Sequence, residues 1–249
     1  MRIVLFLDLD DTIFQTAPKC PADEARQPAA YRRDGTPLSF MTRQQRTFLD
    51  MWQRSATVIP TTARNLDAFR RVDLPFDHYA ILDFGGVVLL PDRTLDPLWD
   101  AEVRPRALEA AVELQAIHRT IVRLIERASL GAYARVISDF DMPLYVVVKH
   151  PDADCAALRM LRDELLRILN LDRFFVHMNG NNLSVGPTFL DKQHAVKHII
   201  ERRLGPEPMV TIGMGDSLSD AAFLEQCDFS VMPRGCQLAG QRFRAGEGS

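Results

Sequence analysis

Two aspartates, Asp8 and Asp10, follow directly on a short apolar run, Ile3 to Leu7. A run of this kind is typical of a strand buried on both faces. Residues two apart on an extended chain project to the same side, so the two carboxylates lie close together. Such a pair is costly unless a cation lies between the carboxylates or one of them keeps its proton. The pair therefore indicates an oxygen-lined Mg²⁺ site or a nucleophile beside a proton donor; the alternative is that one of them caps a turn.

A second pair of aspartates, Asp216 and Asp220, follows another apolar run, Met209 to Ile212. Gly213 and Gly215, which come in between, let the backbone turn closely at that point. In a doubly wound sheet the loops at the carboxyl ends of the strands converge on one crevice. We therefore expect the two acidic pairs to meet, although an aspartate at the start of a helix is often only a cap.

Two further residues could handle a charged ligand. Lys192 lies in the first turn of a predicted helix, where the helix dipole disfavours a cation, so an anionic group should compensate it unless it is simply solvated. Thr62 ends an apolar run, where its hydroxyl and the following amides could bind an oxyanion. Capping of the next helix is the alternative role for Thr62.

The elements that must position these residues alternate between strands and helices. Buried strands are predicted at Ile3 to Leu7, Ala56 to Pro60, Tyr79 to Leu82, Met209 to Ile212 and Phe229 to Met232. Helices are predicted after Thr62, from Lys192 onward and after Asp220. This alternation indicates an α/β fold built on a parallel sheet with crossover helices.

The segment between the first two strands carries local signals of its own. Gln15 to Pro28 has no clear period and is expected to be irregular. Asp34-Gly35 predicts a hairpin turn between short extended runs. Thr42 to Gln45 fits a capping box at the start of a helix.

The pattern changes between Val87 and Pro187. A long helix is predicted near Pro105 to Ser129, followed by two strand-like runs and a second helix. The segment is predicted to close with a β-hairpin across the turn from Asn179 to Asn182. Strands paired through short turns with helices between them indicate an α+β module inserted into the parallel-sheet domain.

Composition excludes several broad classes of protein. The 249 residues are 47% hydrophobic and 25% charged, which rules out disorder as the main state. With 30 Lys and Arg against 33 Asp and Glu, the net charge of −3 offers no basic field for nucleic acid or an anionic membrane. The N-terminal apolar run is too short for a signal segment or membrane span, so we expect a cytoplasmic protein with reduced cysteines.

Taken in order, these residues resemble the four motifs of the haloacid dehalogenase superfamily of phosphohydrolases. The motifs are Asp8-Leu9-Asp10-Asp11-Thr12, Thr62 in Thr61-Thr62-Ala63-Arg64, Lys192, and Gly215-Asp216-Ser217-Leu218-Ser219-Asp220. The insert resembles the C2-type (type IIB) cap of the subgroup that contains Cof-like sugar phosphatases and sucrose-phosphate phosphatase. The resemblance implies a doubly wound, Rossmann-like core formed by residues 1–86 and 187–249, with residues 87–186 as an α+β cap.

The resemblance also implies roles for individual residues. Asp8 would attack phosphorus to form an aspartyl-phosphate, and Asp10 would protonate the leaving oxygen and then activate water. Asp8, the main-chain carbonyl of Asp10 and Asp216 would hold Mg²⁺, with Asp220 assisting through water or by orienting Lys192. Lys192 and Thr62 would neutralise and bind the phosphoryl oxygens.

Substrate recognition is expected in Arg64 and in the cap asparagines Asn179, Asn181 and Asn182, whose amides could bond sugar hydroxyls. The asparagines could equally serve only as turn residues. The sequence departs from the subgroup at Ala63, where glycine is usual, at Phe84-Gly85-Gly86, where an Asn-Gly turn is usual, and at Ser219, where asparagine is common.

The resulting prediction is a Mg²⁺-dependent phosphatase acting on a small phosphate monoester, such as a sugar phosphate. Its partners would be a small-molecule phosphate ester and no nucleic acid or membrane, with the chain acting as a monomer or homodimer. A phosphotransferase or phosphosugar mutase on the same scaffold is the competing enzyme. A phosphate-ligand sensor without turnover is the alternative from another class, although such a protein would ordinarily lack Asp8 or Asp10.

Overall fold

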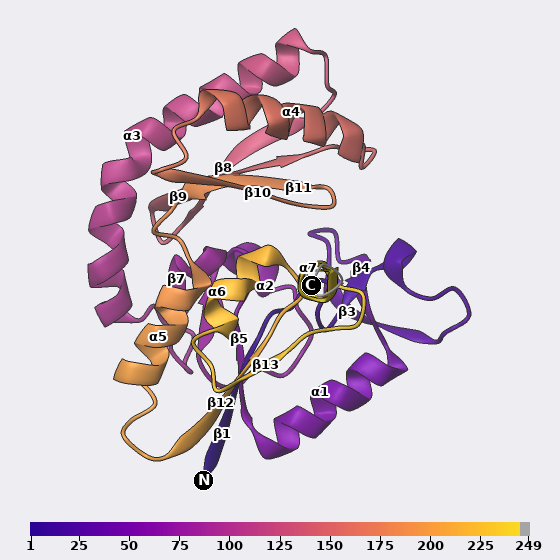
Figure 1. Ribbon diagram of the computed structural model, residues 1–249, viewed down its shortest axis with the longest axis vertical. Helices are drawn as coiled ribbons and strands as arrows, with labels where there is room; N and C mark the ends of the chain where they lie inside the picture. Colours follow the sequence, from indigo (N-terminus) through magenta and orange to yellow (C-terminus); the bar gives the residue numbers. More distant parts are fainter. Residues whose placement is uncertain (245–249) are drawn as a thin grey trace. The chain divides into compact units, whose positions relative to one another are not determined.

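A computed structural model of the protein describes residues 1–244 (Figure 1). The chain divides into two compact units, one formed by Met1–Trp99 with the C-terminal part from Asp191, the other by Asp100–Leu190. The boundaries lie beyond the expected positions, residues 87 and 186. The shift at the first boundary has a structural reason, because the strand that begins at Val87 pairs with a strand of the first unit.

A parallel sheet forms the centre of the first unit. Its strand order is β13-β12-β1-β5, with bounds Phe229–Val231, Met209–Met214, Arg2–Leu7 and Thr57–Pro60. Strand β1 pairs along its full length with β12, and Val4, Leu5, Phe6 and Leu7 are fully buried. Burial on both faces explains the uninterrupted apolar run in the sequence. The carboxyl end of β1 therefore lies beside that of β12, which brings the two acidic segments together.

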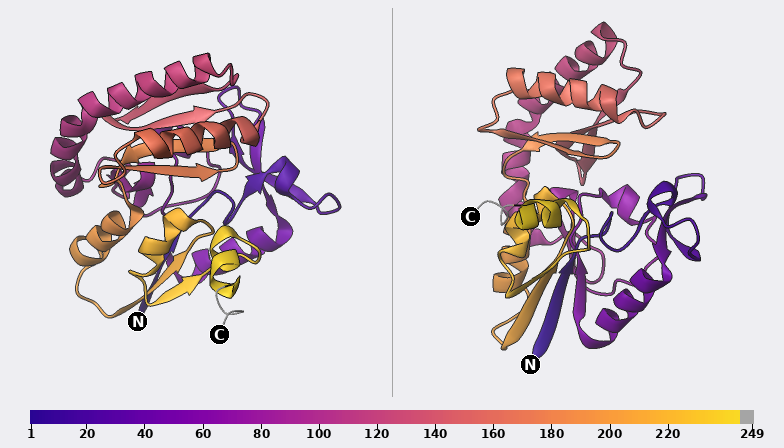
Figure 2. Two further views of the ribbon diagram at one scale, coloured as in Figure 1. Left: turned by 45° about the horizontal axis from the view of Figure 1, so that its top comes forward. Right: turned by 45° about the vertical axis from the view of Figure 1, so that its right-hand side comes forward.

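Helices lie on both sides of this sheet. Helix α1 (Arg43–Ser55) lies on one side, and α5 (Lys192–Arg202) and α6 (Ala221–Leu224) lie on the other (Figure 2). The predicted capping box is confirmed at the start of α1, where the Thr42 side chain accepts from the Gln45 amide and the Gln45 side chain accepts from the Thr42 amide. The short 3-10 helix η3 (Leu218–Asp220) directly precedes α6, and the last helix of this unit is α7 (Gln237–Arg244).

Two small antiparallel sheets complete the first unit. One has the order β2-β4-β3, with bounds Gln15–Thr16, Pro37–Thr42 and Arg26–Tyr31. The 3-10 helix η1 (Ala17–Lys19) lies between β2 and β3 along the chain. The expectation that Gln15 to Pro28 is irregular is wrong in part, because β4 supplies a partner for both β2 and β3. Proline is tolerated in β3 because the register shifts next to Pro28.

The other small sheet joins β6 (Ala80–Leu82) to β7 (Val87–Leu89) through the 3-10 helix η2 (Asp83–Gly85). Strand β6 continues the parallel order through a bridge between Thr61 and Ile81. The helix expected after Thr62 is the single turn α2 (Leu66–Phe69), capped by the side chain of Asn65. These connections place the loop that follows β5 next to the end of β6.

The second unit is an α+β module with its own core. Its sheet has the order β10-β11-β9-β8, with bounds Phe174–Asn179, Asn182–Pro187, Met142–Lys149 and Tyr133–Asp139. Helices α3 (Pro97–Arg127) and α4 (Cys155–Ile168) provide the other half of the core. Buried side chains from both helices and from the sheet form one cluster: Leu114, Ile117, Ile121, Ile125, Val146, Val148, Leu158, Leu161, Leu165, Phe174, Leu183 and Val185.

Helix α3 begins earlier than the sequence predicted. The expected start near Pro105 is wrong, because Asp96 caps the helix by accepting from the amides of Leu98 and Trp99, and Pro97 occupies the first helical position. Proline is favoured there because its fixed φ suits the helix and its missing N–H would lack a partner anyway. Within the described part of the chain, no helix is both long and apolar enough to cross a membrane.

Candidate active site

Asp8 lies where β1 ends and is almost completely buried. Its main-chain N–H donates to the carbonyl of Met214 at 2.8 Å, which ties the end of β1 to the end of β12. The pairing of β1 with β12 therefore also fixes the backbone of Asp8. Asp216 follows two residues after Met214 and is also buried.

Lys192 joins two of the aspartates. Its ammonium donates to Asp8 Oδ1 at 2.7 Å and to Asp220 Oδ1 at 2.6 Å, and its side chain is only 2% exposed. The position of Lys192 follows from α5, whose N-cap is Asp191. The anionic compensation that a lysine in a first helical turn requires is thus supplied by two carboxylates from distant parts of the chain.

Thr12 lies between the carboxylates of Asp8 and Asp216. Its hydroxyl lies 2.8 Å from Asp8 Oδ2 and 3.2 Å from Asp216 Oδ1. No separate role was predicted for this threonine, although it follows Asp8 by only four residues. Because a hydroxyl has one proton, it donates to one carboxylate at a time.

Asp220 uses both of its oxygens within the protein. Oδ1 accepts from Lys192, and Oδ2 accepts from the amides of Asp216 and Ser217 and from the Ser217 hydroxyl. Asp220 therefore holds Lys192 and the loop that carries Asp216 in fixed positions. For Ser217, as for Thr12, the residue pattern predicted no separate role.

The charges of this cluster are out of balance. Burial raises the pKa of Asp8 well above its ordinary value; Lys192 opposes the shift, and Asp220 and Asp216 reinforce it. Burial, together with repulsion from Asp220 and Asp11, raises the pKa of Asp216 to about 7. For Lys192, burial acts to lower the pKa, but attraction by Asp220 and Asp8 outweighs burial and raises it. One ammonium is thus too little positive charge for three buried carboxylates.

The donor set fits a hard divalent cation. One oxygen from each of Asp8, Asp216 and Asp220 lies within 4.8 Å of the other two. Buried carboxylate oxygens are the ligands that Mg²⁺ prefers, and a cation would relieve the excess negative charge. The carboxylate of Asp10 is not part of this cluster. From the sequence, Asp10 was expected to bind the metal through its main-chain carbonyl.

Asp10 instead pairs with Arg64. The guanidinium donates from Nε to Asp10 Oδ2 at 2.6 Å and from Nη2 to Asp10 Oδ1 at 2.8 Å. Arg64 follows the loop of Thr62, whose hydroxyl accepts from the Arg64 amide at 3.1 Å. Thr62 is buried, and its own amide donates to the carbonyl of Ile81.

Comparison with solved structures assigns the fold. The C-terminal domain of trehalose-6-phosphate phosphatase from C. albicans matches 90% of this chain and 73% of that chain, with 14% identity and a TM-score of 0.58. The sucrose-phosphatase of Synechocystis sp. PCC6803, solved with sucrose and phosphate, matches 100% of this chain and 90% of that chain, with 17% identity and a TM-score of 0.57. The chain has the haloacid dehalogenase fold. The cap is of the C2 type.

A third solved structure has a similar fold. The N-terminally truncated IMP-nucleotidase of Plasmodium falciparum matches 93% of this chain and 66% of that chain, with 11% identity and a TM-score of 0.54. No family model matches the sequence, and no curated protein matches it either. At these identities the likeness establishes the fold, and the residues of the site must carry any argument about function.

In the cap of this haloacid dehalogenase fold, the three candidate asparagines occupy one hairpin. Asn179 and Asn182 pair across the ends of β10 and β11, so the predicted hairpin is confirmed. The Asn181 side chain accepts from the His150 amide at 2.9 Å and donates to the His150 carbonyl at 2.7 Å. The amide of Asn181 therefore fastens the hairpin to the segment after β9.

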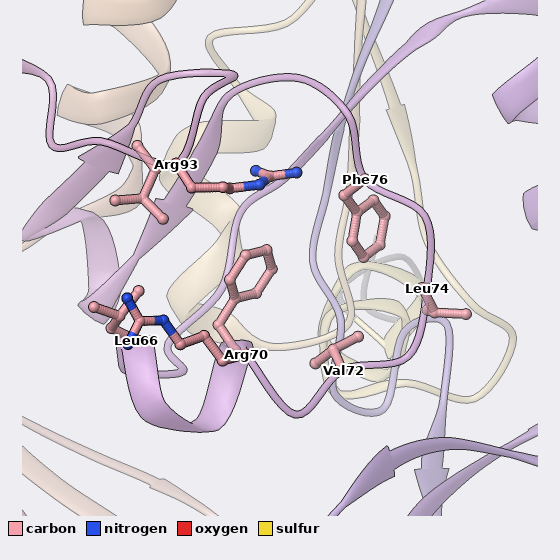
Figure 3. Close-up of a pocket in the computed structure, with 8 residues that line it drawn as sticks. Leu66, Arg70, Val72, Leu74, Phe76 and Arg93 are labelled. Carbon is pink, nitrogen blue, oxygen red and sulfur yellow. The ribbon is translucent and has the colours of Figure 1, made fainter.

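A separate cavity lies in the haloacid dehalogenase core beside α2 (Figure 3). It has a volume of about 220 Å³ and is lined by Leu66, Phe69, Arg70, Val72, Leu74, Phe76, Leu89 and Arg93. Its walls are mostly apolar, and the Arg93 guanidinium lies over the Phe69 ring. None of the acidic residues described above lines this cavity.

Proposed function

We propose that the protein is a Mg²⁺-dependent phosphatase that hydrolyses a small phosphate monoester through an aspartyl-phosphate on Asp8. The observation that carries the proposal is the buried group formed by Asp8, Asp216, Asp220 and Lys192 at the carboxyl ends of β1 and β12. Three carboxylates held together at the end of a parallel sheet, with one lysine between them, are a costly arrangement that stability alone does not require.

Asp8 is the nucleophile in this proposal. Its Oδ1 and Oδ2 are oriented by Lys192 and Thr12, respectively, so the carboxylate is held in one orientation. Fixing an attacking group in this way lowers the entropic part of the barrier. Lys192 also places a positive charge beside the oxygens of an incoming phosphoryl group, and Asp220 keeps Lys192 there.

Asp10 is the acid and base in this proposal. It would protonate the leaving oxygen and then accept a proton from the water that hydrolyses the aspartyl-phosphate. Its side chain is 46% exposed, whereas those of Asp8 and Asp220 are almost fully buried. This exposure suits a group that exchanges protons with leaving group and solvent.

Mg²⁺ would be held by the carboxylates of Asp8 and Asp216 and by the main-chain carbonyl of Asp10, and when bound it supplies positive charge to the phosphoryl oxygens. Asp220 would orient Lys192 and the loop of Asp216, because its two oxygens already accept hydrogen bonds from them.

A panel of phosphorylated metabolites with released phosphate as the readout tests the proposal. Sugar phosphates and nucleoside monophosphates belong in the panel because solved structures of this fold include a sucrose-phosphatase and an IMP-nucleotidase. We expect hydrolysis that requires Mg²⁺ and stops with EDTA. Asp8→Asn should reduce turnover by at least about 10³-fold, the order expected when a catalytic nucleophile is removed.

Asp11→Asn is the matched control. Asp11 neighbours the same segment, is bonded to Lys19 and has φ +62°, a conformation that asparagine also accepts. Because Asp11 contributes only part of the repulsion that acts on Asp216, this variant should keep activity within about tenfold of wild type, far above Asp8→Asn. Undiminished hydrolysis in EDTA, or an active Asp8→Asn variant, would refute the mechanism, and transfer of phosphate to an added alcohol instead of water would indicate a phosphotransferase.

A further inference from the structure

We propose that Arg64 is a positioning residue for Asp10, holding its carboxylate in the orientation from which it serves the leaving oxygen. The inference rests on the proposed phosphatase function, because it assigns a second residue to the acid and base step. It differs from the expectation that Arg64 binds substrate.

The contact between the two side chains is bidentate. Nε and Nη2 of Arg64 each donate to a different oxygen of Asp10, at 2.6 and 2.8 Å. A planar fork that meets both carboxylate oxygens fixes the rotation of the carboxylate as well as its position. A lysine or a solvent molecule could not fix both.

Arg64 is itself rigidly held. Its side chain is only 11% exposed, its Nη1 donates to the carbonyl of Ala68 at 3.2 Å, and its guanidinium carbon lies 5.0 Å from the centre of the Phe14 ring. Its main chain is bonded on both sides, to the Thr62 hydroxyl and to the amide of Asp83. A fork fixed at so many points can act as a rigid support.

Asp10 needs such a support. Its side chain is 46% exposed, and among the side chains that the structure describes, those of residues 1–240, Arg64 is the one hydrogen-bonding partner of its carboxylate. Without Arg64 this carboxylate would sample its rotamers freely in solvent. Positioning a catalytic group is worth orders of magnitude in rate, and displacement of about 1 Å can cost about 10²-fold.

The fork also connects two parts of the proposed site. The main chain of Arg64 lies in the loop of Thr62, the residue expected to bind a phosphoryl oxygen. Its guanidinium contacts Asp10. The donors that face Asp10 are already engaged, so a substrate would have to displace Asp10 to use them. Positioning of the acid is therefore the role that the contacts favour.

Matched aryl phosphates test this role. p-Nitrophenyl phosphate has a good leaving group that needs little protonation, whereas phenyl phosphate has a more basic one and depends on the acid. The measured quantity is kcat/KM, which reports steps up to formation of the aspartyl-phosphate. In Arg64→Met we expect kcat/KM to fall at least tenfold more for phenyl phosphate than for p-nitrophenyl phosphate, and Arg64→Lys should restore part of the loss.

A double-mutant cycle with Asp10→Asn completes the test. If Arg64 acts through Asp10, the double variant Arg64→Met/Asp10→Asn should be no slower on phenyl phosphate than Asp10→Asn alone. Arg71→Met is the control, since Arg71 also pairs with an aspartate, Asp67, and bonds main-chain carbonyls but does not contact Asp10. It should leave both substrates unaffected.

The outcomes separate the two proposals. A wild-type protein that releases phosphate neither from the aryl phosphates nor from any member of the metabolite panel would refute the phosphatase function and, with it, the role of Arg64. An active wild type whose Arg64 variants lose both substrates equally, or whose losses add to that of Asp10→Asn, would refute the role of Arg64 alone. Should Arg64→Met fail to fold, Arg64→Lys gives the same comparison, since it keeps the charge and loses the fork.

Discussion

At the scale of single residues, the site is governed by the cost of burying charge. Asp8, Asp216 and Asp220 are buried around a single ammonium, and the raised pKa values of Asp8 and Asp216 express the missing positive charge. The lysine at the start of α5 was expected to need an anion, and it has two. What the residue pattern could not predict is the partner of Asp10, because Arg64 is 54 positions away along the chain.

Asp96 is buried outside this cluster, and its altered pKa predicts that the stability of the fold depends on pH. Burial acts to raise its pKa, but hydrogen bonds from Arg203 and His198 outweigh burial and lower the pKa to about 2. An acid whose pKa is lower in the folded state stabilises the fold above its unfolded pKa of 3.8 and loses that contribution as pH falls towards 2. The shift corresponds to about 2 kcal/mol, of which about 1 kcal/mol should be gone at pH 3.

The check compares wild type with Asp96→Asn in urea unfolding at pH 5.5 and pH 3. The difference in unfolding free energy between the two proteins should shrink by about 1 kcal/mol at the lower pH. The subtraction removes the contribution of the other carboxylates. A difference that is equal at the two pH values, or larger at pH 3, would contradict the assignment.

At the scale of elements, α5 carries Lys192, and its N-terminus is placed by a close approach of η2. A Cβ added to Gly85 would lie 2.5 Å from the carbonyl oxygen of Asp191, the N-cap of α5. Gly85 also has φ +94°, and its carbonyl accepts from the indole of Trp99. In the sequence, Gly85-Gly86 stands where the family usually has an Asn-Gly turn. The group that requires glycine at position 85 is the carbonyl of Asp191, which lies far away along the chain.

Gly85→Ala tests how strictly this contact places Lys192. The new methyl group must push the Asp191 carbonyl away, so we expect unfolding to become easier by about 3 kcal/mol, the upper end for a strained backbone position. Hydrolysis should fall at least tenfold, because the ammonium of Lys192 moves with α5.

Gly35→Ala is the control for this variant. Gly35 has a similar φ of +81°, but a Cβ there meets nothing within 4 Å. It should cost about 1 kcal/mol from backbone strain alone and leave activity unchanged. Equal losses of stability and activity in the two variants would mean that the contact with Asp191 does not position the site.

At the scale of the whole molecule, the chain builds two hydrophobic cores. The cap core joins α3 and α4 to its own sheet, and the parallel sheet has a separate set of buried side chains. Units with separate cores can open separately, because the contacts that hold one unit are not lost when the other unfolds. A core substitution in the second unit can therefore leave the packing of the parallel sheet unchanged.

Native-state hydrogen exchange should reveal the separate units. Leu161→Ala, in α4, removes a side chain that is 2% exposed and should lower the stability of cap amides by about 3 kcal/mol. Protection of β9 and β11 should fall, whereas that of β1 and β12 should not. Leu49→Ala, in α1, should show the reverse pattern, and a uniform loss of protection in either variant would indicate a single cooperative unit.

The sequence by itself determined the local features of this protein. The apolar runs of the central strands, the capping box at Thr42, the hairpin at Asn179 to Asn182 and the positions of the acidic residues all depend on neighbours within a few positions. The hairpin predicted at Asp34-Gly35 is confirmed, since β3 and β4 pair on either side of that turn. The strand at Gln15 and the start of β3 near Arg26 were missed because β4, and not their own residues, gives them a partner.

Only the tertiary structure decided which charges meet. The contacts of Lys192 with Asp8 and Asp220, of Thr12 with Asp216 and of Arg64 with Asp10 join segments far apart in the chain. The energy of such a contact depends on distance and burial, and neither can be read from residue types before the strands are paired. The same carboxylate type thus becomes a buried member of an acidic cluster at position 216 and a half-exposed partner of arginine at position 10.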